Sequence, residues 1–506
     1  FLIELDSSDS IYLSAESDSS LAGGFTMGAY VVDSGSDATA ILTAVDTISI
    51  TAKEKNHVAY GLYTQGAGAL AQLSAKDVLI SATVTDEPLF AYALVGAAGH
   101  VDIDSSNNAT ILSTGTGAYA SSLSGATSLV EIDAGNDVAI NASTIAASAQ
   151  GGTIDIQAGH DARLHSESNT GAYADGENSR VNVAAKNDVD VASSAVSAFA
   201  SGGAIELNAG RNVVATSETD AAFYATGGGS VTVNAGGTAQ ATAVKNAVYA
   251  YSGGSITMGV VAEDGQGNGQ NVVFAGTVDE AGYGNATALM SYSQSSIALN
   301  SVDGNYIHGA AVALRGSTEA ATTIAITGGV NSVQSFAVIA NAGDLQDEEA
   351  FAGKNVISAL YAEGAGSSIT LSGRNVLQTY ADNTDEDQLE RTVWAYDSAD
   401  ITLHGWTSIS TDRYETSPNS LDIAIAAGTA VNLTSDLVNA PVADRAVVTL
   451  EYDTFESNGE TQRISNITGD ILAAYAGQVD IYAADGSGAG INIKGNLLSG
   501  NNGVLN

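Results

Sequence analysis

Apolar and polar residues alternate in short runs along this chain, and the runs recur at a narrow spacing. The sharpest copies are triads with two apolar residues around a polar one: Val101–Ile103, Val130–Ile132, Ile154–Ile156, Val181–Val183, Ile205–Leu207, Val231–Val233 and Ile256–Met258. Successive copies lie 29, 24, 27, 24, 26 and 25 residues apart. Alternation with period two predicts half-buried β-strands, and a repeat of this length predicts a solenoid.

Two further runs complete each repeat. An Asp or Asn stands in a turn five residues after the triad, and a second alternating run follows it. These turn residues are Asn108, Asp137, Asp161, Asp188 and Asn212. Short Asx side chains suit a turn because they bond to the local backbone. The third run places an aromatic residue among alanines, as in Ala118–Ala120 and Ala172–Ala174. The aromatic stripe is either a ligand-binding surface or a structural ladder, and we favour the ladder.

Three strands per repeat, without a helical period, predict an all-β chain. The expected fold is a right-handed, three-sided parallel β-helix, with the hand taken from the strong bias of parallel crossovers. We expect residues 1–506 to form a single elongated domain that is a fragment of a longer protein.

The C-terminal half is less regular. Some steps between triads grow to 41, 45 and 48 residues after residue 258, which indicates loop or hairpin insertions. Within 446–464, two candidate strands flank Asn458-Gly459, a strong hairpin signal. We expect a β-hairpin excursion there, with Tyr452 and Phe455 as candidate binding residues. A lateral cover over the core is an equally good interpretation of the segment.

Composition removes several classes of function. The chain has 57 acidic and 16 basic residues, a formal net charge of −41 and no cysteine. Nucleic acid and anionic lipid surfaces are excluded as partners, because both require clustered Lys and Arg. No run of about 18 apolar residues occurs, so we expect no membrane insertion. The lack of cysteine excludes disulfides and thiol catalysis.

Two loops of the irregular region carry candidate chemistry. Asp382, Asp385 and Asp387 offer oxygen ligands of the kind that Ca²⁺ takes, although their spacing matches no EF-hand and a solvated loop is the favoured interpretation. Arg413 and Tyr414 pair a cation with an aromatic ring and are candidates for contacting a partner. An ordinary solvated turn is favoured there too. We expect no other cofactor.

Enzymatic activity is not expected. Val32–Ser36 resembles part of a serine-protease signature, but a nucleophilic serine needs a positioned histidine and carboxylate, and the six histidines are spread along the chain. Acidic residues are so abundant that a carboxylate pair carries little weight. His160 occupies a repeated turn position and is interpreted as a turn residue rather than a ligand. No catalytic residue is assigned, and a polysaccharide-binding or polysaccharide-degrading β-helix remains the alternative.

The repeat resembles the passenger domains of bacterial autotransporters, in particular the self-associating and adhesive class. The resemblance rests on the Ala-aromatic-Ala runs, the turns Gly228–Ser230 and Gly253–Ser255, the triads and the Ala-Gly-Asn-Asp turn. Filamentous-haemagglutinin-like exoproteins have similar repeats and are a close alternative. The resemblance implies export through the outer membrane and display on the bacterial cell surface. It also implies adhesion, either to copies of itself on neighbouring cells, as in aggregation and biofilm formation, or to a host glycan or matrix protein.

Overall fold

The computed structural model describes most of the chain. The described residues are 2–17, 25–33, 37–86, 91–122, 125–259, 268–276, 286–309, 312–317, 321–335, 355–380, 388–411, 423–428, 445–457, 459–474, 476–500 and 502–506. All regular elements among them are β-strands, β1 to β46. Contacts group the chain into two compact units, Phe1–Gln240 and Ala241–Asn506, which are described separately here. The expected single domain over 1–506 stays a prediction.

Each coil of the first unit contains three strands. The first strands of the coils are β1 (Leu2–Ser7), β4 (Ala38–Ala44), β7 (Ala69–Val84), β9 (His100–Ser113), β11 (Leu129–Ala134), β14 (Thr153–Ala158), β17 (Arg180–Ala185), β20 (Ala204–Ala209) and β23 (Ser230–Ala235). The second strands are β2 (Ile11–Ser17), β5 (Thr47–Glu54), β12 (Val138–Ala142), β15 (Ala162–Ser166), β18 (Asp188–Ser193) and β21 (Asn212–Ser217), and the long β7 and β9 serve both positions. The third strands are β3 (Phe25–Val32), β6 (Val58–Gln65), β8 (Ala91–Ala97), β10 (Thr116–Ser121), β13 (Ile145–Gln150), β16 (Thr170–Asp175), β19 (Val196–Ser201) and β22 (Ala221–Thr226).

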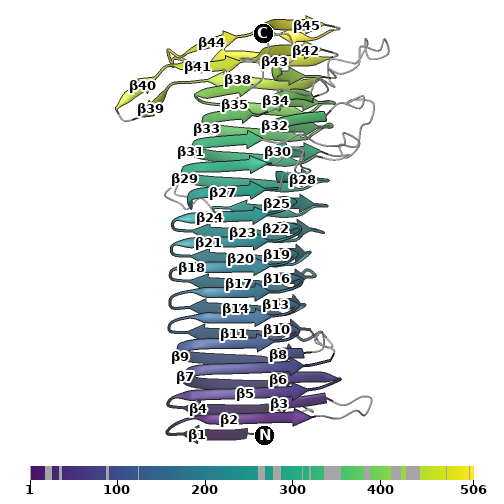
Figure 1. Ribbon diagram of the computed structural model, residues 1–506, viewed down its shortest axis with the longest axis vertical. Helices are drawn as coiled ribbons and strands as arrows, with labels where there is room; N and C mark the ends of the chain where they lie inside the picture. The colour runs from purple at the N-terminus through teal and green to yellow at the C-terminus, as the bar shows by residue number, and fades with distance from the viewer. Residues whose placement is uncertain are drawn as a thin grey trace. The chain divides into compact units, whose positions relative to one another are not determined.

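Strands pair in parallel with their equivalents in the next coil. β11 pairs with β14, β12 with β15 and β13 with β16, and Figure 1 shows the first strands of this unit stacked in order. The register places Val130 on Ile154 and Ile132 on Ile156. These pairings confirm the expected parallel β-helix with three strands per coil.

The triads line the interior, as their alternation predicts. The outer residues of the six triads between 101 and 233 are at most 1% exposed. The third strands add alanines to this core, and Ala118, Ala172 and Ala198 have no exposed surface. Gly171 shows how tightly this side closes: a Cβ there would lie 2.7 Å from the carbonyl oxygen of Ser197 in the next coil. Small residues are therefore required where the third strand approaches the core.

The second unit repeats the three-strand coil with longer connections. Its first strands are β26 (Ser255–Met258), β29 (Ser296–Gly309), β31 (Thr323–Ser335), β33 (Ser368–Thr379), β35 (Asp400–His404), β38 (Ala446–Tyr452), β43 (Gly477–Ala483) and β46 (Val504–Leu505). Its second strands are β27 (Asn268–Ala275), β36 (Thr407–Thr411), β41 (Ile464–Thr468) and β44 (Gly490–Lys494), with the later parts of β29, β31 and β33. Its third strands are β25 (Asn246–Tyr251), β28 (Thr287–Tyr292), β30 (Val312–Ser317), β32 (Asn355–Glu363), β34 (Gln388–Tyr396), β37 (Ile423–Ala427), β42 (Asp470–Ala474) and β45 (Leu497–Gly500), and β24 (Thr238–Ala243) contains the boundary between the units.

A ladder of buried asparagines runs through the second unit. Asn271, Asn305, Asn331 and Asn375 have no exposed surface and occupy equivalent positions in four successive coils. The side-chain amide of each of the first three donates to the Oδ1 of the next, at 2.8, 2.8 and 2.9 Å. Each of the four amides also donates to a backbone carbonyl oxygen, at 3.0 or 3.1 Å. The ladder thus satisfies polar groups inside the coil that would otherwise be costly to bury.

The expected hairpin over 446–464 is shorter in the structure. Residues 446–452 form β38, which pairs in parallel with β35 and β43 as part of the coil. Only β39 (Phe455–Ser457) and β40 (Glu460–Gln462) pair with each other as antiparallel strands, and Figure 1 shows them extending to one side of the neighbouring coil strands of this unit. The Arg374 guanidinium lies 5.4 Å from the ring centroid of Phe455 and 5.0 Å from that of Trp406. These two cation–π contacts connect the hairpin to the coil.

Candidate functional site

The Asx turn residues of the first unit form a hydrogen-bonded ladder between coils. Oδ1 of Asp137 accepts the backbone N–H of Asp161 at 3.1 Å, and Oδ1 of Asp161 accepts that of Asp188 at 3.3 Å. Oδ1 of Asp188 accepts the backbone N–H of Asn212 at 3.2 Å. The sequence interpretation was that these side chains bond to their own local backbone. It was wrong about the hydrogen-bond partner, which is the backbone of the next coil. Each oxygen binds the backbone of the next coil at the turn or at the first residue of the strand that follows it.

At three Asx positions the preceding residue supplies a second donor to the coil below. The side-chain amide of Asn107 donates to Asp77 at 2.7 Å, and that of Asn136 donates to Asn108 at 2.9 Å. Nε of Arg211 donates to Asp188 at 2.8 Å. His160 takes this place in its own coil. The ladder is thus a continuous polar edge whose side chains differ in charge from coil to coil.

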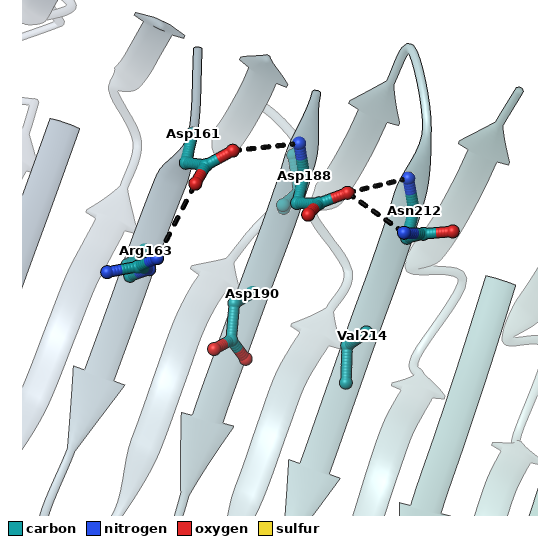
Figure 2. Close-up of a pocket in the computed structure, with 7 residues that line it drawn as sticks. Asp161, Arg163, Asp188, Asp190, Asn212 and Val214 are labelled. Atoms are coloured by element: carbon teal, nitrogen blue, oxygen red, sulfur yellow. Dashed lines mark hydrogen bonds and ion pairs between the residues drawn. The ribbon is translucent and has the colours of Figure 1, made fainter. Parts of the chain in front are cut away.

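Three strands beside this edge enclose a small pocket of about 160 Å³. Arg163 of β15, Asp190 of β18 and Val214 of β21 are in register and form its floor, and Figure 2 shows them side by side below the ladder residues. Asp161, Asp188 and Asn212 line the upper rim, with Val189 completing the wall. Period-two geometry places each rim residue two positions before a floor residue on the same face of the strand.

Two carboxylates in the pocket have pKa values displaced in opposite directions. Burial raises the pKa of Asp190, and the positive charges of Arg163 and His165 offset part of this rise. The hydrogen bonds from Arg211 hold the pKa of Asp188 below its usual range. The exposed guanidinium of Arg211 contacts both carboxylate oxygens of Asp188. A carboxyl group with a raised pKa beside one with a lowered pKa is an arrangement that acid–base catalysis uses.

A separate acidic surface lies on the first strands of the same unit. Asp102, Glu131 and Asp155 stand above one another on the outward side of β9, β11 and β14. Asp104 and Asp133 form a second column two residues along, and Asp133 lines a pocket of about 350 Å³ with Lys186. Burial, followed by repulsion from neighbouring carboxylates, raises the pKa of Asp133 and of Asp155. The contacts that partly compensate this charge are His100 Nε2 at 2.6 Å from Glu131 and the Gln72 amide, which donates to Asp102 at 2.9 Å.

The aromatic stripe of the third strands forms stacked pairs. The rings of Tyr60 and Tyr92 are 5.5 Å apart and nearly parallel, and those of Phe199 and Tyr224 are 4.7 Å apart with an angle of 2°. Burial, with the charge of neighbouring tyrosines, raises the pKa of Tyr60 and Tyr92. Other neighbouring rings of the stripe are tilted or edge-on, so the rings pack against one another in several geometries. This geometry favours the structural ladder.

Most residues singled out from the sequence do not meet in this region. Asp382, Asp385, Asp387, Arg413 and Tyr414 lie outside the described residues. Tyr452 ends β38, half-buried and in register with Ala483, and Phe455 packs on Arg374. The structure therefore uses Phe455 in packing the hairpin.

Sequence reasoning missed Asp190 and the pairing of Arg211 with Asp188. The alternating Asp188-Val189-Asp190 was a usable signal, since it places two carboxylates on one face of a strand.

Comparisons with protein-family models, with curated proteins and with solved structures found no match to this chain. Among the residues that the structure describes, no helix is long and apolar enough to span a membrane.

Proposed function

We propose that this chain is an adhesive domain of the bacterial cell surface that associates with copies of itself on neighbouring cells. The observation that carries the proposal is an unbroken outward column of polar side chains, in register over seven coils of the first unit. The column consists of Gln72, Asp102, Glu131, Asp155, Asn182, Glu206 and Thr232. The resemblance of the repeat to self-associating autotransporter passengers supports the same conclusion.

A column of this kind suits contact along the sides of two molecules. Its rungs repeat at the strand spacing of about 4.8 Å, so a single alignment of two copies brings many weak contacts together. Linked weak contacts reach high avidity without any strong individual one. The carboxylates at Asp102, Glu131 and Asp155 oppose the approach of a second copy. Salt, which screens this repulsion, and Ca²⁺, which carboxylates bind, should therefore strengthen the association.

The test is the molar mass of the purified chain in solution, measured by light scattering at low and moderate salt, with and without Ca²⁺. We expect a concentration-dependent dimer or larger species that grows with salt. Replacing two of the column's carboxylates, with Glu131→Gln and Asp155→Asn, should reduce the dependence of the association on salt. Glu177→Gln with Glu218→Gln removes the same charge at exposed sites off this face and should leave the salt dependence unchanged.

A strict monomer under all these conditions would reject homotypic association. Association that weakens as salt is added would also contradict it. In the first case, binding of host glycans or matrix proteins by the monomer becomes the better explanation of an adhesive surface, and it is measured with immobilised ligands.

Polysaccharide hydrolysis is the second candidate, and the opposed pKa values of Asp188 and Asp190 favour it. The two residues stand two positions apart on the same face of β18, so their Cα atoms are about 7 Å apart, and both line the same pocket. The pocket of about 160 Å³ is small against the roughly 300–1,000 Å³ of ordinary ligand sites, which ranks this function second. Release of reducing ends from polysaccharides, abolished by Asp190→Asn and retained by Glu177→Gln, would establish it. If the wild-type chain releases none from neutral and acidic polysaccharides, hydrolysis is ruled out for those substrates.

A further inference from the structure

The polar edge contains one rung that differs chemically from the others. Nδ1 of His160 lies 3.2 Å from Oδ1 of Asp137 in the coil below and 3.2 Å from Oδ1 of Asp161 in its own coil. The three ligand atoms all lie within 4.8 Å of one another. The side chains of His160 and Asp137 are 52% and 43% exposed, while that of Asp161 is only 13% exposed. The cluster is thus open to solvent on one side.

The equivalent rungs show what is unusual here. Asn107, Asn136 and Arg211 each direct a nitrogen that can only donate toward an oxygen of the coil below, at 2.7 to 2.9 Å. The His160 nitrogen is instead equidistant from two carboxylate oxygens, and both distances lie at the upper end of the range for an N–H···O bond. A single proton on Nδ1 cannot serve both oxygens well. A cation between the three atoms can contact all of them, because a neutral imidazole offers Nδ1 as a lone-pair ligand.

We propose that Asp137, His160 and Asp161 form a binding site for a divalent first-row transition metal, with Zn²⁺ as its representative. Bonds of about 2.1 Å separate neighbouring ligands by about 3.0 Å in an octahedron and 3.4 Å in a tetrahedron, and the two observed distances lie between these values. One imidazole with two carboxylates is a donor set for Zn²⁺ or its neighbours, whereas Ca²⁺ takes oxygen ligands and more of them. Water completes the coordination.

The carboxylates are already held in place for this role. Oδ1 of Asp137 accepts the backbone N–H of Asp161, and Oδ1 of Asp161 accepts the backbone N–H of Asp188. Both carboxylate oxygens are therefore oriented by hydrogen bonds from the backbone of the next coil. Such outer hydrogen bonds fix metal ligands in other sites. The Arg163 guanidinium lies 3.4 Å from the second oxygen, Oδ2, of Asp161, which leaves Oδ1 for the metal. A bound ion would link two successive coils at their turn, and it would stabilise the folded chain by mass action.

The repeat itself supplies the decisive variant. His160→Asn gives this coil the residue that Asn136 provides in the coil below, so the ladder keeps a donor and we expect the variant to fold. His165→Asn is the control, because it removes an exposed imidazole on β15 outside the cluster. We would titrate metal-free full chain with Zn²⁺ by calorimetry. A second readout is the shift of the thermal unfolding midpoint in the same buffer.

The wild-type chain and His165→Asn should bind one equivalent of Zn²⁺ at this site and gain thermal stability. His160→Asn should lose at least tenfold in affinity, together with the shift. Equal Zn²⁺ affinity in His160→Asn and the wild type, or no binding by the wild type, would overturn the proposal. Should His160→Asn fail to fold, Asp137→Asn replaces it, since Asn108 fills that ladder position in the coil below. The result is independent of self-association, which is read from molar mass.

Discussion

The buried asparagine ladder should tolerate substitution at its centre poorly. In Asn331→Ala, three side-chain hydrogen bonds disappear: two donated by Asn331, at 3.0 and 2.9 Å, and one accepted from Asn305 at 2.8 Å. Each contributes about 1 kcal/mol net, and a buried partner left unpaired costs about 1–3 kcal/mol. Asn305 keeps its bond to a backbone carbonyl, which limits the second contribution. The free energy of unfolding should therefore fall by about 3–5 kcal/mol.

Two measurements on the full chain test this expectation. Urea unfolding gives the change in free energy, and amide hydrogen exchange locates it, because solenoid coils can open locally. Gln334→Ala is the matched control, since Gln334 lies three residues along the same strand and is only half-buried; it should change stability by less than about 0.5 kcal/mol. Should Asn331→Ala cost no more than Gln334→Ala and leave exchange in the neighbouring coils unchanged, the ladder would have no stabilising role.

Three other perturbations address the close packing, the acidic surface and the hairpin. Gly171→Ala should lower the free energy of unfolding by about 1–3 kcal/mol, because its Cβ would meet the next coil's backbone; an unchanged urea midpoint would show that the coil relaxes freely. The raised folded pKa values of Asp133 and Asp155 mean that the folded state holds these protons more tightly than the unfolded chain. Their contribution to stability is present at acid pH and is lost as pH rises above 3.8 through the folded pKa. Replacing both residues with Asn should therefore raise the free energy of unfolding at neutral pH relative to its value at acid pH. Parallel profiles of this free energy against pH, measured by urea unfolding of variant and wild type, would contradict this. Arg374→Ala removes the cation between two rings and should accelerate amide exchange in β39 and β40, while unchanged protection would mean that Phe455 alone fixes the hairpin.

The coil was predictable because its interior repeats strictly. Val130, Ile154 and Val181 share one interior position, and burial forces an apolar residue there in every coil, so alternation and spacing together define the three strands. The asparagine ladder obeys the same rule with a polar residue. The sequence did contain a signal for this ladder, because a glycine stands one to three residues before the asparagine in Gly304-Asn305, Gly328–Asn331 and Gly373–Asn375. This signal did not stand out among many Gly-Asn turns.

The pocket could not be predicted, since it depends on neighbours from different coils. Arg163 and Asp190 are 27 residues apart in the sequence, and only the exact register places them side by side. A shift of one residue would turn one of them inward. The type of outward residue also varies freely between coils. Alternation therefore predicts which face of the strand a residue occupies, but not which side chain it carries. The pairing of Arg211 with Asp188 joins two coils through a turn in the same way.

Self-association would use a surface feature that repeats in every coil, whereas metal binding and hydrolysis would each use a site that occurs once. Substitutions can therefore distinguish these functions. The outward column of polar side chains presents one residue on each successive coil, so removing Glu131 alone alters one contact among many. Association should therefore change gradually as more residues of the column are substituted. His160 and Asp190 each occur once among the equivalent described positions of neighbouring coils, so one substitution should weaken Zn²⁺ binding at least tenfold or abolish hydrolysis. A graded response in molar mass, together with an at least tenfold loss of Zn²⁺ affinity from one substitution, would show that the chain supports both a distributed surface and a local site.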